Sequence, residues 1–273
     1  MFEDKRTVLV TGGTSGIGKA TAKLLHEEGF ITYASGRNLS KAKDIEELGI
    51  KLLYIDLENE NTMVEGVKKI IDENGRIDVL VNNAGYGIAG AIEEVPIEEA
   101  RRQFEVNLFA QMRLCQLVIP YMVENKSGKI INITSVASLV PSPILSWYCA
   151  SKVSLSFMSL ALRSELRQFG IDVVEVAPGG IRTNWPIIAS ENLSKFSKDP
   201  KYSNIDRRVF EFFQSSIDSS PPPEIVAKKI LKIIRKRKTK PRYFVPSYGY
   251  VIDLMLRLTS RSSIDNFYKF MFK

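Results

Sequence analysis

Short apolar runs that alternate with helix-length segments restrict the fold of this chain more than any other feature of its sequence. The runs lie at residues 7–10, 31–34, 52–55, 79–81, 130–133 and 173–176, and longer segments lie at 17–28, 60–74, 97–125 and 149–169. A repeated strand-then-helix order predicts βαβ units, and hence a mostly parallel sheet with helices on both faces. The runs contain few polar residues, as expected of strands that are buried on both sides.

Length and composition indicate how the chain is divided. A chain of 273 residues that is 44% hydrophobic and 25% charged is typical of a folded globular protein, which excludes a disordered chain or a coiled coil. We expect one doubly wound α/β domain over residues 1–246. Within it, residues 183–223 are rich in Ser, Asn, Lys and Phe and end in three prolines, which predicts an irregular lid. Residues 247–273 are expected to form an amphipathic C-terminal extension.

The net charge of +7 is unevenly distributed along the chain. Residues 224–273 contain 13 Lys and Arg against 3 Asp and Glu, whereas residues 1–223 contain 25 against 28. A basic chain would suggest nucleic acid or a membrane surface as a partner. Because the excess belongs to the tail alone, we expect no nucleic acid as a partner of the main domain.

Cysteine and histidine are too scarce for several kinds of chemistry. The chain has two cysteines, Cys115 and Cys149, and one histidine, His26, so we expect no disulfide framework, no metal site and no Ser-His-Asp triad. The N-terminal residues lack the apolar core of a signal peptide, and no run approaches the roughly 18 apolar residues of a membrane span. The cytoplasm is therefore the expected location.

A glycine-rich loop follows the first apolar run, where residues 11–18 have the sequence TGGTSGIG. Glycines at a strand-to-helix turn let the backbone approach a phosphate, and the helix N-terminus offers unpaired N–H groups. The loop of a nucleoside triphosphatase nearly fits residues 13–20, but Ala20 stands where a Mg²⁺-binding hydroxyl is required. The loop therefore favours a dinucleotide, and a triphosphatase is the remote alternative.

The end of the second run indicates which dinucleotide is bound. A site for NAD usually has an Asp or Glu about 20 residues after the glycine loop, where it binds the ribose 2′-hydroxyl. Here the run ends in Gly36-Arg37-Asn38, with no acidic residue. The Arg37 guanidinium is suited to a 2′-phosphate through charge-assisted hydrogen bonds. The sequence therefore predicts NADP(H) rather than NAD(H).

Tyr148 and Lys152 are the candidate acid–base pair. They lie four residues apart at the start of a helix-length segment, and hence on one helix face. A tyrosine has an ordinary pKa of about 10. We expect the Lys152 ammonium to favour the phenolate and so to lower the pKa of Tyr148.

Several further motifs accompany this pair in a fixed order. They are NNAG at 82–85, the isolated Asn107, Ser135 thirteen residues before Tyr148, and PGGIRT at 178–183. With this combination the chain resembles the short-chain dehydrogenase/reductase family over about residues 5–185. The resemblance implies a Rossmann-type, seven-stranded parallel sheet in the order 3-2-1-4-5-6-7. It also implies a homodimer or homotetramer formed through the segments 97–125 and 149–169.

The resemblance also assigns roles to residues of this chain. It makes Tyr148 the general acid in ketone reduction and the base in alcohol oxidation. Lys152 lowers its pKa and holds the nicotinamide ribose, Ser135 hydrogen-bonds the substrate carbonyl, and Asn107 holds a water that passes protons to Lys152. The implied cofactor-binding residues, with Arg37 and Asn38 added, are Gly12, Thr14, Ser15, Gly16, Ile17, Gly18, Asp56, Leu57, Asn83, Ala84, Gly85, Tyr148, Lys152, Pro178, Gly179, Ile181 and Thr183.

The expected substrate is a lipophilic carbonyl or alcohol. The loop between Ser135 and Tyr148 contains no charged residue, and in the family that it resembles this loop forms a wall of the substrate cleft. Leu139, Leu145 and Trp185 are the apolar candidates for contact with the substrate, although the lid aromatics can equally be packing residues. A catalytically idle NADP(H)-binding sensor or scaffold is the main alternative function, and the complete Asn-Ser-Tyr-Lys set argues against it.

The C-terminal tail has two interpretations. Its last 31 residues contain eight aromatics, with Arg257, Arg261, Lys269 and Lys273 among them, and helical patterns are expected at 225–234, 248–258 and 264–272. Basic and aromatic residues on short amphipathic helices are typical of an interfacial anchor, which predicts peripheral membrane contact. The other interpretation is a charge run beside helices that complete the fold or a subunit interface.

Overall fold

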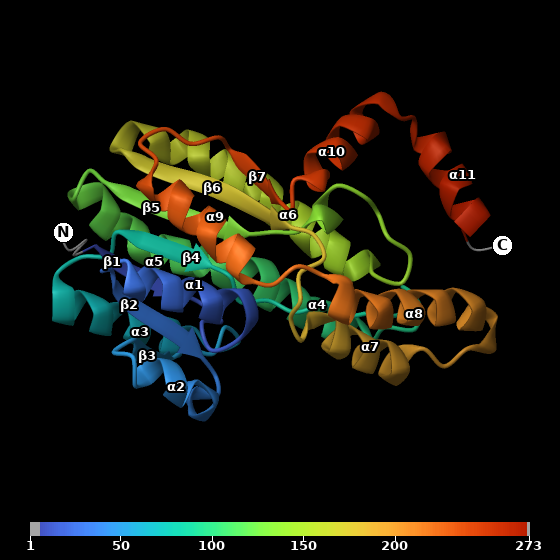
Figure 1. Cartoon of the computed structure of the whole chain (residues 1–273), viewed down its shortest axis with the longest axis horizontal. Helices are drawn as coiled ribbons and strands as arrows, with labels where there is room; N and C mark the ends of the chain where they lie inside the picture. Colours follow the sequence, from blue (N-terminus) through green and yellow to red (C-terminus); the bar gives the residue numbers. More distant parts are fainter. Residues whose placement is uncertain (1–5, 272–273) are drawn as a thin grey trace.

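The computed structural model describes residues 6–271, so Lys273 of the predicted basic tail lies outside the described residues. Seven parallel strands form one sheet in the order β3-β2-β1-β4-β5-β6-β7 (Figure 1). The order confirms the predicted topology. The strands are β1 Thr7–Val10, β2 Ile31–Gly36, β3 Lys51–Tyr54, β4 Val79–Asn82, β5 Gly128–Ile133, β6 Ile171–Pro178 and β7 Arg242–Val245.

Helices cover both faces of the sheet, as the apolar strands predict. On one face lie α1 Gly16–Glu27, the short α2 Lys43–Glu46 and α9 Glu224–Arg235, packed on a core that includes Val8, Val81 and Ile230. On the other face lie α3 Glu60–Asn74, α5 Ala110–Glu124 and α6 Ser146–Leu166, with Leu9 and Leu114 in their core. The two cores bury the strands on both sides, which explains their lack of polar alternation.

The predicted long helix over 97–125 is wrong in one respect, because it is three elements and not one. It consists of α4 Ile97–Phe104, a π-helical turn Glu105–Phe109, and α5. A π-turn inserts an extra residue into a helix and is frequent at functional sites. The π-turn carries Asn107, which is fully buried. Asn107 lies on the side of the helix formed by α4, the π-turn and α5 that faces the loop after β4.

The prediction of an irregular lid is also wrong. Residues 183–223 contain two ordered helices, α7 Trp185–Phe196 and α8 Ser203–Ser219, which pack on each other beyond one end of the sheet (Figure 1). Their apolar contacts recur at helical spacing, with Ile205, Val209 and Phe213 of α8 in one cluster with Leu193 of α7. Phe210 and Phe212 lie between these positions and are exposed, so they obscure the period in the sequence.

Two further helices follow β7. They are α10 Tyr248–Leu258 and α11 Arg261–Met271, and they extend from the same end of the sheet as the lid (Figure 1). Within residues 6–271, no helix combines the length and the apolarity that a bilayer span requires. The same residues contain no group of three or more His, Cys, Asp or Glu side chains placed to hold a metal ion.

Candidate active site

The glycine-rich loop forms a backbone cradle between β1 and α1. Gly12 and Gly16 have φ values of +60° and +49°, a left-handed conformation that favours glycine. A Cβ on Gly18 would lie 2.2 Å from the Gly12 carbonyl oxygen, so the turn requires glycine there. The first turn of α1 contains no acidic residue, and its N–H groups and positive dipole end therefore remain suited to an anion.

The NNAG motif holds this cradle in place. The Asn83 side-chain amide donates to the Thr11 carbonyl at 2.9 Å, and the backbone amides of Asn83 and Ala84 both donate to the Thr11 hydroxyl at 3.0 Å. The Asn82 amide donates to the Asn132 side chain at 2.9 Å between β4 and β5. Asn83 therefore positions the glycine loop through its side chain, in addition to lying beside the predicted cofactor site.

Arg37 lies at the carboxyl end of β2 next to the glycine loop. Thr14 of the loop is so close to Gly36 that a Cβ on Gly36 would lie 2.8 Å from the Thr14 hydroxyl oxygen. The Arg37 side chain is 61% exposed and contacts Glu58 at 3.3 Å. Glu58 also accepts two hydrogen bonds from Arg102, at 2.7 and 2.9 Å. These hydrogen bonds are the main cause that lowers the pKa of Glu58. Because Arg102 already neutralises Glu58, the Arg37 guanidinium can bind an anion.

The loop after β3 completes this side of the site. Ile55 donates its backbone N–H to the Gly36 carbonyl, which joins the ends of β2 and β3. Asp56 accepts the backbone N–H of Glu58 at 3.1 Å, and Leu57 is buried. The residues predicted to contact the adenosine end therefore follow adjacent strands. Asn38 instead accepts a hydrogen bond from Ser40.

Tyr148 and Ser135 meet through their hydroxyl groups. Ser135 follows β5, and Tyr148 lies in the first turn of α6 with only 8% of its surface exposed. Burial raises the pKa of Tyr148 to about 12, while the hydrogen bond to Ser135 acts in the opposite direction. The expected lowering by Lys152 is not found, because Lys152 does not contribute to this shift and burial decides its direction. The phenol is consequently protonated near neutral pH.

Lys152 lies on the same face of α6, one turn after Tyr148. Its ammonium donates to the Ile133 carbonyl at 3.0 Å and lies 6.0 Å from the centroid of the Tyr148 ring. The side chain is buried, and this desolvation lowers the pKa of Lys152 to about 8. Among the described residues, no carboxylate forms an ion pair with it. A Cβ on Gly85 would lie 3.4 Å from its ammonium nitrogen, so Lys152 reaches the backbone of the NNAG loop.

Asn107 connects the π-turn to this loop. Its side-chain oxygen accepts the Tyr86 N–H at 3.1 Å, and its amide donates to the Tyr86 carbonyl and to Ser151 at 2.9 and 3.0 Å. Asn107 therefore positions the loop and the start of α6. Its predicted role in holding a water remains a prediction.

Sequence reasoning missed two residues near Asn107 whose side chains also hydrogen-bond to the backbone of this loop. Gln111 donates to the Ala84 carbonyl at 2.8 Å, and Gln103 accepts the Ile88 N–H at 2.5 Å. Alternate residues of the 84–88 loop are thus held from one side of the helix formed by α4, the π-turn and α5, by Gln103, Asn107 and Gln111. Their four-residue spacing was the available signal, since amides at this period on a helix face one way.

Glu175 is a third residue that the sequence analysis did not single out. This buried carboxylate in β6 accepts hydrogen bonds from Thr134 at 2.7 Å, from Ser156 at 3.0 Å and from Arg242 at 2.8 Å. It joins the end of β5, helix α6 and the edge strand β7 near the predicted catalytic residues. A single acid inside an otherwise apolar run was its signal.

The PGGIRT motif connects the glycine loop, the lid and α10. The Gly179 N–H donates to Val245 at 2.8 Å, and the Gly180 N–H donates to the Tyr248 hydroxyl at 2.8 Å. A Cβ on Gly16 would lie 3.3 Å from the Thr183 methyl, so the motif adjoins the phosphate cradle. The predicted residues Pro178, Gly179, Ile181 and Thr183 all lie at the carboxyl end of the sheet, next to the other site residues.

Residues of α7 and α8 cover Tyr148. The Trp185 ring at the start of α7 lies 5.0 Å from the Tyr148 ring and 5.7 Å from the ring of Phe213 in α8. Leu145 packs in the same apolar cluster as Trp185. Leu139 is half-buried on the loop and does not belong to that cluster. The face of Tyr148 toward the lid is therefore apolar.

The lid is attached to the loop that follows the NNAG motif. Asn192 of α7 donates to the Gly87 carbonyl at 3.1 Å, and Lys201 forms an ion pair with Glu93 at 2.5 Å. Lys198 and Asp199 donate their backbone N–H groups to the Glu94 carboxylate. These contacts keep Trp185 over Tyr148.

The comparisons with known proteins agree with this geometry. Residues 6–192 match the family model described as short chain dehydrogenase. The chain is 33% identical to a 3-ketodihydrosphingosine reductase of Bacteroides thetaiotaomicron, over 95% of this chain and 93% of that protein. It is 32% identical to an NADPH-dependent 3-dehydrocapnine reductase of Ornithobacterium rhinotracheale, over 97% and 96%. A crystal structure of a short-chain dehydrogenase from Streptomyces avermitilis superposes with a TM-score of 0.83 and 26% identity, covering 99% of this chain and 98% of that chain. The chain therefore belongs to the short-chain dehydrogenase family of oxidoreductases.

Proposed function

We propose that this protein is an NADPH-dependent oxidoreductase that reduces a lipophilic ketone or aldehyde to the alcohol, with the reverse oxidation also available to it. The observation that carries the proposal is the contact between the hydroxyls of the buried Tyr148 and the half-buried Ser135, with Lys152 one turn away on the same helix. Two hydroxyls that converge beneath an apolar cover can bind one carbonyl oxygen.

NADP(H) is the cofactor that the residues fit best. The glycine cradle at the start of α1 suits a pyrophosphate, and a Cβ at Gly12 would approach Ala84 to 3.0 Å, so the narrow turn has no room for side chains. The exposed Arg37 suits a 2′-phosphate. The name of the Ornithobacterium relative also specifies NADPH. When bound, the cofactor supplies the hydride for the reduction.

The proton comes from the chain itself. Tyr148, whose phenol stays neutral at physiological pH, donates its proton to the carbonyl oxygen, and Ser135 donates a second hydrogen bond to that oxygen. The Lys152 ammonium holds the cofactor ribose and restores the tyrosine proton. Asn107 keeps the 84–88 loop in register with α6 so that these groups stay aligned.

A lipophilic substrate is supported by the surroundings of Tyr148. Trp185, Phe213 and Leu145 form an apolar wall, and binding sites of this kind select apolar ligands. The Bacteroides relative is named for a keto derivative of dihydrosphingosine. The test is a panel of ketones of increasing alkyl length, with NADPH oxidation followed by absorbance. Turnover that rises with alkyl length supports the proposal, whereas turnover confined to sugars or small acids contradicts it.

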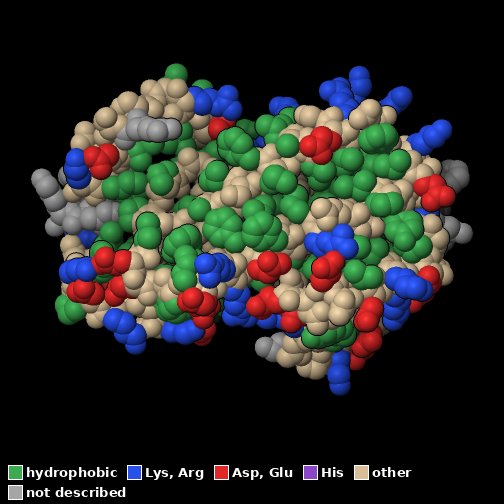
Figure 2. All heavy atoms as spheres, turned by 180° about the vertical axis from the view of Figure 1, so that it is seen from behind, with side chains coloured by type: hydrophobic (Ala, Val, Ile, Leu, Met, Phe, Trp, Pro, Cys, Tyr) green, Lys and Arg blue, Asp and Glu red, His purple; other side chains and the backbone are tan. Residues whose placement is uncertain are grey.

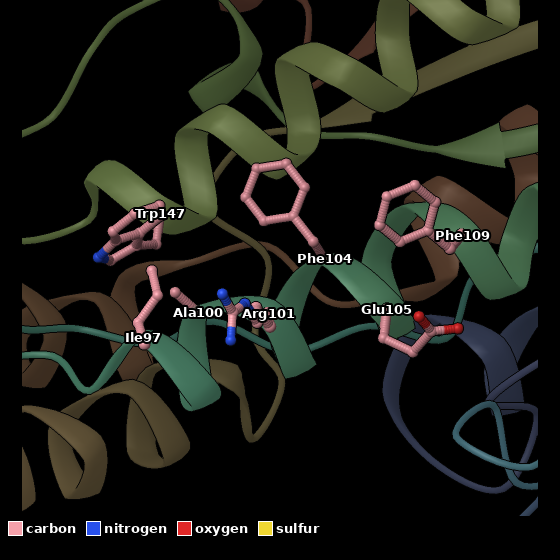
Figure 3. Close-up of a pocket in the computed structure, with 7 residues that line it drawn as sticks. All are labelled: Ile97, Ala100, Arg101, Phe104, Glu105, Phe109 and Trp147. Carbon is pink, nitrogen blue, oxygen red and sulfur yellow. The ribbon is translucent and has the colours of Figure 1, made fainter.

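We also propose that the protein self-associates through the face formed by α4, α5 and α6. Large apolar side chains are exposed there, with Phe109 at 57%, Phe157 at 73% and Leu160 at 54%. Figure 2 shows hydrophobic side chains gathered across the middle of the face behind the sheet. An apolar groove crosses the same region (Figure 3), and it is lined by Ile97, Ala100, Arg101, Phe104, Glu105, Phe109 and Trp147.

An apolar area of this extent on a helical face is typical of a subunit interface. Light scattering on the wild type should give a dimer or tetramer, and Phe157→Asp should reduce the mass. An unchanged mass in the variant, or a wild-type monomer, contradicts the assignment.

A further inference from the structure

We infer that helix α10 places an apolar stripe in the surface of a lipid bilayer beside the active-site entrance. The stripe consists of Val251, Leu254, Met255 and Leu258, whose exposed fractions are 58%, 59%, 61% and 81%. At about 100° per residue, their consecutive spacing of three, one and three residues places all four within an arc of about 100° on one side of the helix. Four adjacent, mostly exposed aliphatic side chains are costly in water and require an apolar partner.

The fold holds α10 in a set orientation. The side opposite the stripe contains Gly249, which is buried against the Phe244 ring of β7, so closely that a Cβ there would be 2.7 Å from it. The Tyr248 hydroxyl accepts the Gly180 N–H at 2.8 Å, and the Tyr250 and Phe244 rings meet edge to face at 5.0 Å. The stripe therefore faces outward because the other side of the helix is attached to the sheet.

The size of the stripe favours a bilayer over a second copy of the chain. An 11-residue helix is about 16 Å long, and a stripe about 10 Å wide covers roughly 160 Å², whereas a stable dimer buries about 800 Å² on each partner. An amphipathic helix of this kind is sufficient for shallow insertion at a lipid interface, where the apolar face enters the acyl boundary.

The charges near α10 indicate apolar rather than electrostatic docking. The helix carries one acid and one base, Asp253 and Arg257, and they pair at 3.0 Å. The basic run of the tail lies before β7, at the other end of that strand from α10. There Arg235 pairs with Glu28, and the Lys236 carbonyl accepts a hydrogen bond from Lys129. The tail is thus not one basic and aromatic anchor, and the stripe should bind zwitterionic lipid.

The position of α10 connects the bilayer to the site, a step that rests on the proposed lipophilic substrate. The helix follows the carboxyl end of β7 and contacts Gly180 of the cofactor loop. In the following helix, α11, the Tyr268 hydroxyl donates to the Pro141 carbonyl at 2.5 Å, on the loop between Ser135 and Tyr148. The two helices therefore contact two segments that adjoin the proposed site, α10 the PGGIRT motif and α11 the loop that walls the proposed cleft, and a lipophilic ketone would enter there from the membrane.

The test uses the full chain and flotation with phosphatidylcholine vesicles. The wild type should float with the vesicles at both low and high salt. Leu254→Ser/Leu258→Ser should lower the partition coefficient at least about tenfold, because two side chains no longer transfer from water to the acyl region. The matched control is Leu48→Ser/Ile92→Ser, which removes side chains that are 48% and 60% exposed elsewhere, and it should float like the wild type.

Three results would overturn the inference. They are a wild type that stays in the aqueous phase, equal partitioning of the two double variants, and binding that requires phosphatidylserine and disappears in high salt. A reversible dimer that is lost in Leu254→Ser/Leu258→Ser without any vesicle binding would assign the stripe to a second copy. NADPH oxidation with a short, water-soluble ketone should be unchanged in Leu254→Ser/Leu258→Ser. If even the wild type fails to turn over any ketone while it floats, the proposed function fails and the docking surface stands.

Discussion

The ring of Trp185 in the lid lies 5.0 Å from the ring of Tyr148, with an angle of 48° between their planes. This contact joins the lid to the proposed proton donor, and Phe213 supports it from behind. The lid therefore contributes directly to the burial that keeps the phenol protonated. It also provides an apolar surface that the alkyl chain of the proposed substrate would contact.

Trp185→Ala tests this contribution. We expect kcat/KM for a long-chain ketone to fall at least about tenfold, mainly through KM, because the variant loses the aromatic surface that the substrate covers. A small ketone should lose less. Phe210→Ala is the lid control, since this side chain of α8 is 40% exposed. Equal losses for long and short ketones would show that the tryptophan does not contact the alkyl chain.

Arg37→Ala tests the cofactor assignment. The variant removes charge-assisted hydrogen bonds to a 2′-phosphate, which are worth about 1.5–3 kcal/mol, so kcat/KM for NADPH should fall about 10- to 100-fold while that for NADH changes little. Glu58 keeps its two hydrogen bonds from Arg102, so the fold should be unaffected. Arg113→Ala, which removes a comparable surface ion pair with Glu60, is the control. A parallel loss with both cofactors, or no loss, contradicts the role of Arg37.

Glu175→Gln should destabilise the protein without touching substrate or cofactor. The amide cannot match three donors from Thr134, Ser156 and Arg242, and we expect the free energy of unfolding to fall by about 2 kcal/mol. Denaturation in urea measures this directly. Glu60→Gln provides the comparison, because its ion pair with Arg113 is exposed and should contribute about 0–1 kcal/mol. Equal effects of the two changes would mean that Glu175 does not join β5, α6 and β7.

The pH dependence of reduction should follow Lys152. Burial lowers the pKa of Lys152 to about 8 and raises that of Tyr148 to about 12. The ammonium is therefore lost above about pH 8, while the phenol keeps its proton well beyond that point. The kcat/KM for ketone reduction should be constant below about pH 8 and decline above it. A profile that stays flat to pH 10 would contradict a role for the Lys152 ammonium.

The strands could be predicted from the sequence because burial on both faces leaves a clear apolar pattern, whereas their order was implied by the resemblance to the short-chain dehydrogenase/reductase family. The same holds for the glycine loop and the Tyr148–Lys152 pair, whose spacing is local. The lid helices were missed because the exposed Phe210 and Phe212 interrupt the apolar period that Ile205, Val209 and Phe213 of α8 otherwise form. Local pattern gave no sign of the π-turn that carries Asn107.

Two site properties depend on contacts between distant parts of the chain. Trp185 and Phe213 bury Tyr148 from more than 30 residues away in sequence, so the sign of its pKa shift could not be predicted from Lys152 alone. The basic run near Arg235 and the apolar stripe of α10 are close in sequence, yet β7 separates them. Their adjacency in the chain therefore suggested one anchor where the fold has two separate surfaces.

The Tyr148→Phe variant shows whether Tyr148 donates the proton in an NADPH-dependent reduction. The change removes one hydroxyl and keeps the ring that packs on Trp185. The measurement pairs kcat/KM for a long-chain ketone with the Kd for NADPH from its fluorescence. We predict that kcat/KM falls by about 10²- to 10⁴-fold while the Kd stays nearly unchanged. A variant that retains more than roughly a tenth of the wild-type rate, well above that range, would contradict the assignment of Tyr148 as the proton donor.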